Sequence, residues 1–341
     1  RLPIVQAPMA GVQGSALAIA VSEAGGLGSL PCAMLSREAM RSELAAIRAQ
    51  TRQPFNVNFF CHAPPAVSAE HEAVWRAALS PYYREFGIDA NAIAAGPGRA
   101  PFSAEAADVL SEFEPPVVSF HFGLPAADLL ARVRGWGAKI LSSATTVEEA
   151  LWLEGQGVDA IIAQGLEAGG HRGHFLADDL TRQAGTFALV PQIVQAVKVP
   201  VLAAGGISDA KGVAAAMRLG AAGVQVGTAY LLCPEATTSA VHRAALKSEA
   251  ARHTALTNVF SGRPARGIVN RLMRDLGPLS TVPPDFPLAS AAVAPLRTKA
   301  EAQGSGDFSP LWAGQNASGC KEILARDLTR ELAAGLRDDP G

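Results

Sequence analysis

Eight short apolar segments alternate with helical segments between Ile4 and Gly227. The apolar segments are rich in Val, Ile and Ala and lack a period of two, which is typical of parallel strands buried on both faces. Eight βα units in this length match a (β/α)₈ barrel, whereas a doubly wound sheet rarely needs eight evenly spaced units. We therefore predict an α/β fold, a (β/α)₈ TIM barrel. The first strand is expected within the apolar run Ile4–Met9 and ends near Pro8. The other strands are expected at Leu27–Cys32, Phe55–Phe60, Val117–Phe122, Lys139–Ala144, Ala160–Ala163, Pro200–Ala204 and Gly223–Gly227.

Capping residues and interruptions of the pattern define the rest of the organisation. Ser36 and Thr146 each precede a helical segment and can accept a hydrogen bond from its free N–H groups. Segment 61–112 is too long for one connection, so we expect an elaboration with helices near 68–85 and 103–112 and a loop, AAGPGRAP at 94–101, between them. After Ala229 the alternation stops. We expect a barrel over 1–229, a smaller, mostly helical lid over 230–317, and a C-terminal helix within 318–341, near 318–335, that packs back on the barrel.

The composition excludes several classes of protein. A formal charge of −2 gives no electrostatic footprint for nucleic acid. No apolar run approaches the ~20 residues of a membrane span. The chain enters its first strand without the pattern of a secretory signal, and its four cysteines form no CxxC pair. A cytoplasmic protein with reduced thiols is expected.

The C-terminal ends of barrel strands converge on one pocket, so the residues there indicate the chemistry. No lysine ends a predicted strand, which argues against a Schiff-base aldolase. No cluster of acidic residues stands there, which argues against most metal-dependent barrels. The nucleotide dehydrogenases with this fold form a thioester on a cysteine in the loop after the sixth strand. The loop after Ala160–Ala163 has no cysteine, which argues against that class of enzyme. Neutral hydrogen bonders, glycines and imidazoles remain, and these suit a large organic cofactor.

Two glycine-containing loops point to a phosphate. AAGGIS at 203–208 and QVGTAY at 225–230 follow the last two predicted strands, where barrels commonly bind phosphate through backbone N–H groups. The alternative is that these glycines only permit tight turns. Two such loops in register with eight βα units favour the phosphate site, which is consistent with FMN.

His171 is the strongest candidate for a catalytic side chain, because it lies between glycines in the loop after a buried strand. His174 is the alternative in the same loop. For His121, inside a predicted strand, core packing and substrate contact are both open. Glu167 is expected to brace the loop and Arg172 to point outward, so that no free cation stands among the strand ends. The remaining histidines are expected at the surface or in packing: His62, His71, His242 and His253.

The sequence resembles the nitronate monooxygenases, formerly called 2-nitropropane dioxygenases, over nearly its whole length. It is similar to the group that acts without NAD(P)H. The resemblance rests on seven segments in order: QAPMAG at 6–11, NVNFF at 56–60, SFHFGLP at 119–125, QGLEAGGHRGHF at 164–175, LAAGGI at 202–207, QVGTAYL at 225–231 and FSPLWAGQ at 308–315.

The resemblance implies FMN in the barrel mouth and oxidation of alkyl nitronates, such as propionate 3-nitronate, by O₂ to a carbonyl compound and nitrite. It implies His171 as the catalytic residue, as a base or as a stabiliser of the anion, and His121 beside it at the substrate. The WAGQ segment, 312–315, is expected to close over the flavin. The implied cofactor-binding residues are Ala7, Pro8, Met9, Asn58, Gln164, Gly169, Gly170, Gly205, Gly206, Gln225, Gly227 and Thr228.

Two other functions remain open from the sequence. One is a related FMN-dependent reductase that uses NAD(P)H on quinones or enoyl thioesters. The other is a non-redox barrel that binds a phosphorylated metabolite without flavin. The expected partners are small molecules, a nitronate and O₂, and the sequence indicates no particular oligomeric state.

Overall fold

The computed structural model of the chain describes residues 1–93 and 99–336, and within them eight parallel strands form a barrel. The strand order is β1-β9-β8-β6-β5-β4-β3-β2. Hydrogen bonds from Gln6 N–H to Leu27 O (2.9 Å) and from Leu27 N–H to Ile4 O (2.8 Å) close the sheet between its two end strands. The predicted (β/α)₈ barrel is confirmed. Its strands are β1 (Ile4–Gln6), β2 (Gly28–Pro31), β3 (Phe55–Phe60), β4 (Val117–His121), β5 (Lys139–Ala144), β6 (Ala160–Gln164), β8 (Val201–Ala204) and β9 (Gly223–Val226).

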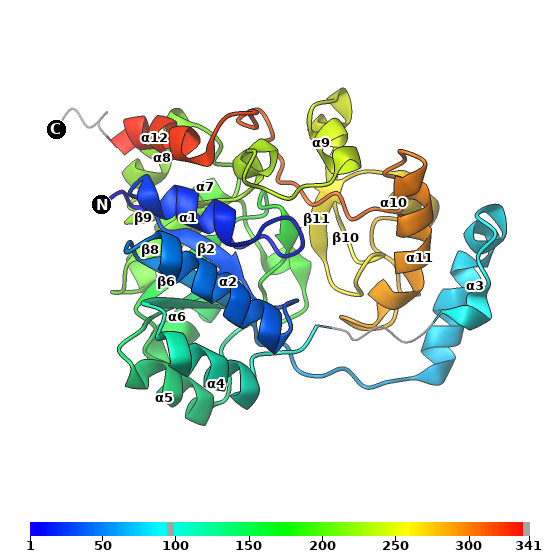
Figure 1. Cartoon of the computed structure of the whole chain (residues 1–341), viewed down its shortest axis with the longest axis horizontal. Helices are drawn as coiled ribbons and strands as arrows, with labels where there is room; N and C mark the ends of the chain where they lie inside the picture. Colours follow the sequence, from blue (N-terminus) through cyan, green and yellow to red (C-terminus); the bar gives the residue numbers. More distant parts are fainter. Residues whose placement is uncertain (94–98, 337–341) are drawn as a thin grey trace.

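Helices surround the barrel and bury their apolar faces against it (Figure 1). The Ser36 side chain accepts a hydrogen bond from Ala39 N–H, and Thr146 accepts one from Glu149 N–H, so both predicted caps are confirmed. The helices are α1 (Ser15–Glu23), α2 (Arg37–Gln50), α4 (Ala104–Phe113), α5 (Ala127–Gly135), α6 (Val147–Gly155), α7 (Thr186–Ala196) and α8 (Ala210–Arg218).

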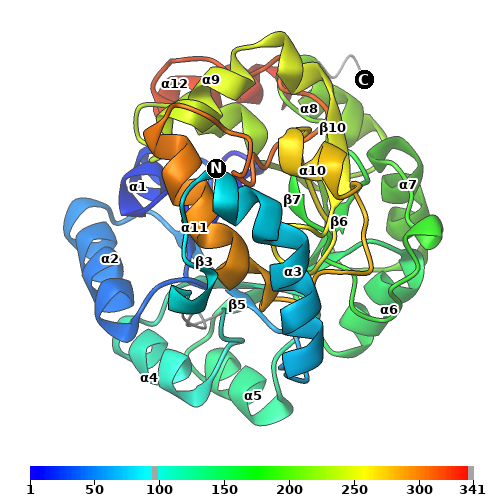
Figure 2. The same ribbon diagram turned by 90° about the vertical axis from the view of Figure 1, so that its right-hand side faces the viewer.

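A second layer covers the mouth of the barrel. Its helices are α3 (Ala69–Glu85), α9 (Ala240–Leu246), α10 (Arg271–Asp275) and α11 (Ala289–Ala302), and Figure 2 shows α3 and α11 in front of the barrel. Short 3₁₀ turns complete the chain: η1 (Ala90–Ala92), η2 (Leu180–Arg182), η3 (Thr228–Leu232), η4 (Glu249–Arg252) and η5 (Ala334–Leu336).

This layer also contains a three-stranded antiparallel sheet that the sequence did not predict. Strands β10 (Thr254–Thr257) and β11 (Ala265–Ile268) pair with each other, and β11 pairs with β7 (Gly170–His171). The two residues of β7 come from the predicted site loop. They become a strand only by pairing with residues far along the chain, a contact that local sequence does not encode.

The segment after β3 reaches across to α11. The Trp75 indole N–H donates to Ala289 O (3.1 Å), and the Tyr83 hydroxyl donates to Ala292 O (2.7 Å), so α3 is joined to α11 rather than to the barrel. Residues 94–98 of the predicted loop at 94–101 lie outside the described residues.

The C-terminal helix is shorter than predicted. Helix α12 spans Ala325–Ala333, whereas a helix was expected near 318–335. Gly319 lies so close to Ser208 that a Cβ at Gly319 would come within 2.0 Å of the Ser208 carbonyl oxygen. The chain before Ala325 is therefore packed along the barrel, where tertiary contact overrides helical periodicity. Helix α12 contacts α1 and α8, and Thr329 on it meets the Tyr230 hydroxyl at 2.9 Å.

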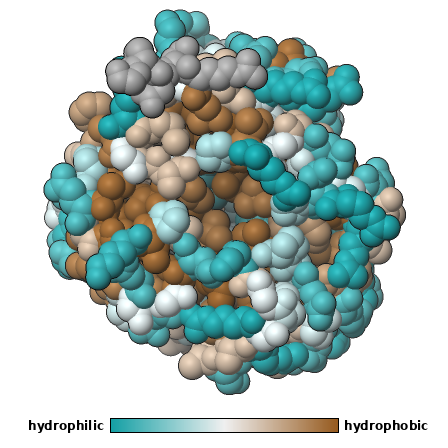
Figure 3. Space-filling view, turned by 90° about the vertical axis from the view of Figure 1, so that its left-hand side faces the viewer, coloured by the Kyte–Doolittle hydropathy of each residue, from teal (hydrophilic) through white to brown (hydrophobic). Residues whose placement is uncertain are grey.

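The end of the barrel opposite the lid is hollowed, with apolar surface inside and hydrophilic residues around it (Figure 3). Partly buried Val117, Ala160 and Leu202, at the starts of their strands, pack against the apolar cluster inside this end of the barrel. Among the described helices, none is both long and apolar enough to cross a membrane.

Candidate active site

A cavity of about 1400 Å³, continuous with solvent, lies at the C-terminal ends of the barrel strands. All residues predicted to bind cofactor or substrate line it: Ala7, Pro8, Met9, Asn58, His121, Gln164, Gly169, Gly170, His171, Gly205, Gly206, Gln225, Gly227 and Thr228. The sequence therefore identified residues that the fold brings to one place.

Gln164, at the end of β6, holds the loop that carries His171. Its Nε2 donates to the His171 carbonyl oxygen (2.9 Å), and its Oε1 accepts from Gly173 N–H (2.7 Å). The amide is thus bonded to main-chain atoms on both sides of the loop. This fixes where His171 stands relative to the strand.

Arg172 points inward, so its expected outward direction is wrong. Its side chain is fully buried, and its guanidinium donates to Gln164 O, Gly165 O and Gln183 Oε1, each at 2.7 Å. Burial lowers its pKa to about 9. The carbonyl groups after β6 need donors when the loop covers them, and Arg172 supplies these donors.

The His171 ring faces the cavity between aromatic side chains and a hydroxyl. Its Nε2 lies 2.9 Å from Ser261 Oγ, and its ring centroid lies 5.2 Å from that of Phe286 and 5.5 Å from that of Trp312. Burial, followed by the positive charge of Arg99, holds the pKa of His171 well below its usual value. His171 is therefore neutral near pH 7, and one of its two ring nitrogens carries no proton.

His121 uses both ring nitrogens inside the protein. Its Nε2 donates to the His171 carbonyl (3.1 Å), so its Nδ1 accepts from the Ser143 hydroxyl (2.5 Å). Burial lowers its pKa to about 3. His121 is a neutral wall of the cavity that also supports the His171 loop. His174, the alternative, is buried and is not among the residues that line the cavity.

The glycine loops approach neighbouring backbone closely. Gly205 and Gly206 have φ of +123° and +72°, conformations that side chains rarely adopt. A Cβ on Gly169 would lie 2.5 Å from Gly314 N. These glycines leave room over the last two strands of the barrel, where a side chain would occupy the cavity or clash.

Glu167 braces the loop, as expected from the sequence. Its carboxylate accepts from the backbone N–H and hydroxyl of Thr186, both at 2.8 Å, and its carbonyl accepts from Gln315 N–H (2.9 Å). Gly314 N–H donates to Thr228 Oγ1 (2.9 Å). The WAGQ segment therefore lies beside the glycine loops, with Trp312 and Gly314 in the cavity wall.

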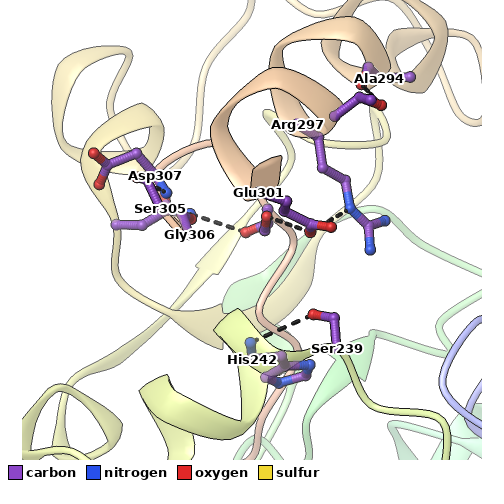
Figure 4. A network of polar contacts seen from close by, with 11 residues as sticks. Ser239, His242, Ala294, Arg297, Glu301, Ser305, Gly306 and Asp307 are labelled. Atoms are coloured by element: carbon purple, nitrogen blue, oxygen red, sulfur yellow. Dashed lines mark hydrogen bonds and ion pairs between the residues drawn. The ribbon is translucent and has the colours of Figure 1, made fainter. Parts of the chain in front are cut away.

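Sequence reasoning missed two charged or titratable residues of the cavity, Arg99 and His242. Arg99 lies in the segment before α4, far from any predicted strand end, and no sequence signal marked it. His242 lies on α9 and lines the cavity together with Trp312. Figure 4 shows it near Glu301 and Arg297 of α11. The expectation that no free cation stands among the strand ends did not consider the lid, from which Arg99 reaches the cavity wall.

No group of three or more His, Cys, Asp or Glu side chains that could hold a metal ion occurs within residues 1–93 and 99–336. The four cysteines are free thiols.

Comparison with known proteins decides the family. The family profile described as "Nitronate monooxygenase" matches residues 1–335. A nitronate monooxygenase from Pseudomonas aeruginosa is 43% identical, over 98% of this chain and 96% of the relative. The chain belongs to the nitronate monooxygenase family. It is therefore an oxidoreductase of a flavoenzyme family that oxidises nitronates.

Solved structures agree with this assignment. A nitroalkane oxidase from Streptomyces ansochromogenes is similar to the chain with a TM-score of 0.90 and 38% identity, covering 99% of this chain and 96% of that one. A FabK from Thermotoga maritima is similar with a TM-score of 0.72 and 26% identity, covering 99% and 92%. The likeness is thus greater to a nitroalkane-oxidising member of the fold.

Proposed function

We propose that this nitronate monooxygenase family member binds FMN in the cavity and oxidises alkyl nitronates with O₂ to a carbonyl compound and nitrite, without NAD(P)H. The observation that carries the proposal is the cavity wall. Amides, glycines and imidazoles from every part of the barrel mouth line one space together with His171. Propionate 3-nitronate is a candidate substrate.

The residues present fit a flavin with a phosphate. Gly205, Gly206 and Gly227 would hold the phosphate together with Thr228, because the three glycines line the cavity without side chains that fill it. Gln225 Oε1 is buried without a hydrogen-bond partner among the described residues, which suits an acceptor for a ligand hydroxyl. The Asn58 Nδ2 group donates to Ser119, which leaves its amide oxygen for a ligand N–H.

The bound flavin supplies the electron transfer, and the chain supplies binding, orientation and proton handling. His171 is neutral and lines the cavity, so it can take the α-proton of a neutral nitroalkane. Ser261 and Gln164 hold its ring and its backbone. Phe60, Phe120 and Trp312 in the cavity wall exclude water around the reacting carbon.

The visible spectrum of the purified protein tests the proposal first. We expect a flavin spectrum that changes on anaerobic addition of propionate 3-nitronate, with nitrite released when air is admitted. NADH should leave the anaerobic spectrum unchanged. A flavin that ignores the nitronate and bleaches with NADH would instead indicate a reductase, and a protein that cannot be reconstituted with FMN would indicate a non-redox barrel.

A further inference from the structure

A cation without an anionic partner among the described residues lies at the His171 end of the cavity. Arg99 lines this end, and its Nη1 atom is buried with no hydrogen-bond partner among the described residues. Its Cζ atom lies 5.5 Å from the ring centroid of Phe286, which is 5.2 Å from the His171 ring. Its positive charge is also the largest charge effect on His171. Arg99 and His171 therefore face the same part of the cavity.

No carboxylate within residues 1–93 and 99–336 forms an ion pair with Arg99. Burial lowers its pKa to about 10, and the neighbouring charge that acts on it is another cation, Arg297. Glu301 accepts from Arg297 (2.8 Å) and from Ser309 (2.6 Å), as Figure 4 shows in part. Glu167, the carboxylate in the cavity wall, is bonded to Thr186. Arg99 is thus a half-buried charge with one fully buried nitrogen, and burial of a charged group is costly unless an anion pairs with it.

The ring beneath Arg99 is packed among other rings. Phe286, over which the Arg99 guanidinium lies, packs edge-on against the His62 ring with centroids 4.8 Å apart and is tilted against the Phe60 ring with centroids 6.1 Å apart. The guanidinium therefore lies over a ring that its neighbours hold in place. The other arginine near His171, Arg263, is engaged: it donates to the His174 carbonyl and lies 4.3 Å over the Phe122 ring.

We infer that Arg99 binds the anionic nitro-oxygen end of the substrate beside His171 and thereby selects the charged nitronate over the neutral nitroalkane. This inference rests on the proposed function. His171 is neutral and cannot offset the substrate's charge, whereas a guanidinium presents parallel N–H groups that match two oxygens of a planar anion.

Steady-state kinetics on the flavin-loaded enzyme test the selection. With Arg99→Gln, we expect the KM for ethylnitronate to rise by about 10- to 100-fold, the loss of one charge-assisted contact. The KM for nitroethane, of the same carbon skeleton but neutral, should change little. Arg99→Lys should bind the nitronate more tightly than Arg99→Gln but less tightly than wild type, because lysine keeps the positive charge but lacks the two parallel N–H donors of the guanidinium. Equal losses for both substrates would overturn the inference.

Arg297→Gln is the matched control, because it removes a neighbouring positive charge that does not line the cavity. It should leave the preference for the nitronate intact. The same loss in Arg297→Gln as in Arg99→Gln would mean that the general field of the lid, rather than contact with Arg99, selects the anion.

A binding measurement separates this inference from the proposed function. Propionate is a planar two-oxygen anion that cannot be oxidised here, and its binding can be followed by fluorescence of the tryptophans, one of which, Trp312, lines the cavity. Arg99→Gln should weaken propionate binding by the same factor by which it raises the KM for ethylnitronate. If wild type fails to oxidise nitronates, this titration still tests Arg99. If nitronates are oxidised but propionate binding is unchanged in Arg99→Gln, the inference alone fails.

Discussion

The Arg172 guanidinium donates through Nη2 to the main-chain carbonyl of Gln164 at 2.7 Å, while the Gln164 side chain donates back to the His171 carbonyl at 2.9 Å. These two residues join the end of β6 to the loop on which the candidate base stands. The ring of His171 is thus positioned by contacts of its neighbours as well as by its own bond to Ser261.

Arg172→Met should destabilise the protein by about 3 kcal/mol, because three buried acceptors lose their donor. Urea unfolding measures this change. Arg172→Lys should fall between wild type and Arg172→Met, since a lysine reaches fewer of the acceptors. Arg132→Met is the control, because Arg132 pairs with Asp108 at an exposed position and its loss should cost at most about 1 kcal/mol. Equal effects of Arg172→Met and Arg132→Met would refute a structural role for Arg172.

His171→Asn should keep its flavin yet lose about 10²- to 10⁴-fold in kcat/KM on a neutral nitroalkane, because an amide cannot take the α-proton. Turnover of a preformed nitronate should fall less, since it needs no deprotonation. Stopped assays for nitrite with both substrates give the comparison. His174→Asn, in the same loop but outside the cavity wall, serves as the control. An unchanged kcat/KM on the neutral nitroalkane in His171→Asn would rule out His171 as the base that takes the α-proton.

Gly206→Val should reduce the flavin content of the purified protein. A side chain at φ +72° is strained, and its Cβ would meet Glu167 at 3.4 Å in the cavity wall. Gly304→Val is a matched control, because Gly304 has φ +76° with nothing within 4 Å of its Cβ position. Both variants carry similar backbone strain. A difference between them in the ratio of flavin absorbance to protein absorbance therefore measures the effect of the side chain inside the cavity. A fully loaded Gly206→Val protein would contradict the phosphate site.

Acid should destabilise the protein partly through His242. Burial lowers its pKa from 6.5 to about 4 in the folded state, so between these values the unfolded chain binds more protons. Stability is therefore lost as the pH falls through this window, by on the order of 2 kcal/mol at pH 5 for this one group. His242→Asn should flatten the fall in unfolding free energy between pH 7 and pH 5. His253→Asn, at an exposed position, should keep the wild-type slope.

The local elements could be predicted from sequence because each carries its own signal. The boundaries of β3 and β5 are those of their apolar runs, and Ser36 and Thr146 cap the helices that follow them. The residues at strand ends could be predicted as one group because the barrel topology brings all C-terminal strand ends to one mouth.

The lid and the charges of the site could not be predicted in this way. Arg99 and His242 reach the cavity from segments that only tertiary packing brings over the barrel. The direction of Arg172 follows from the carbonyl groups it must satisfy after the loop folds. Strand β7 exists only through its pairing with β11. The sequence by itself determined the barrel and the ring of residues at its mouth, since periodicity and caps act locally. Only the tertiary structure decided which cations line the cavity, because burial and long-range pairing are properties of the packed chain.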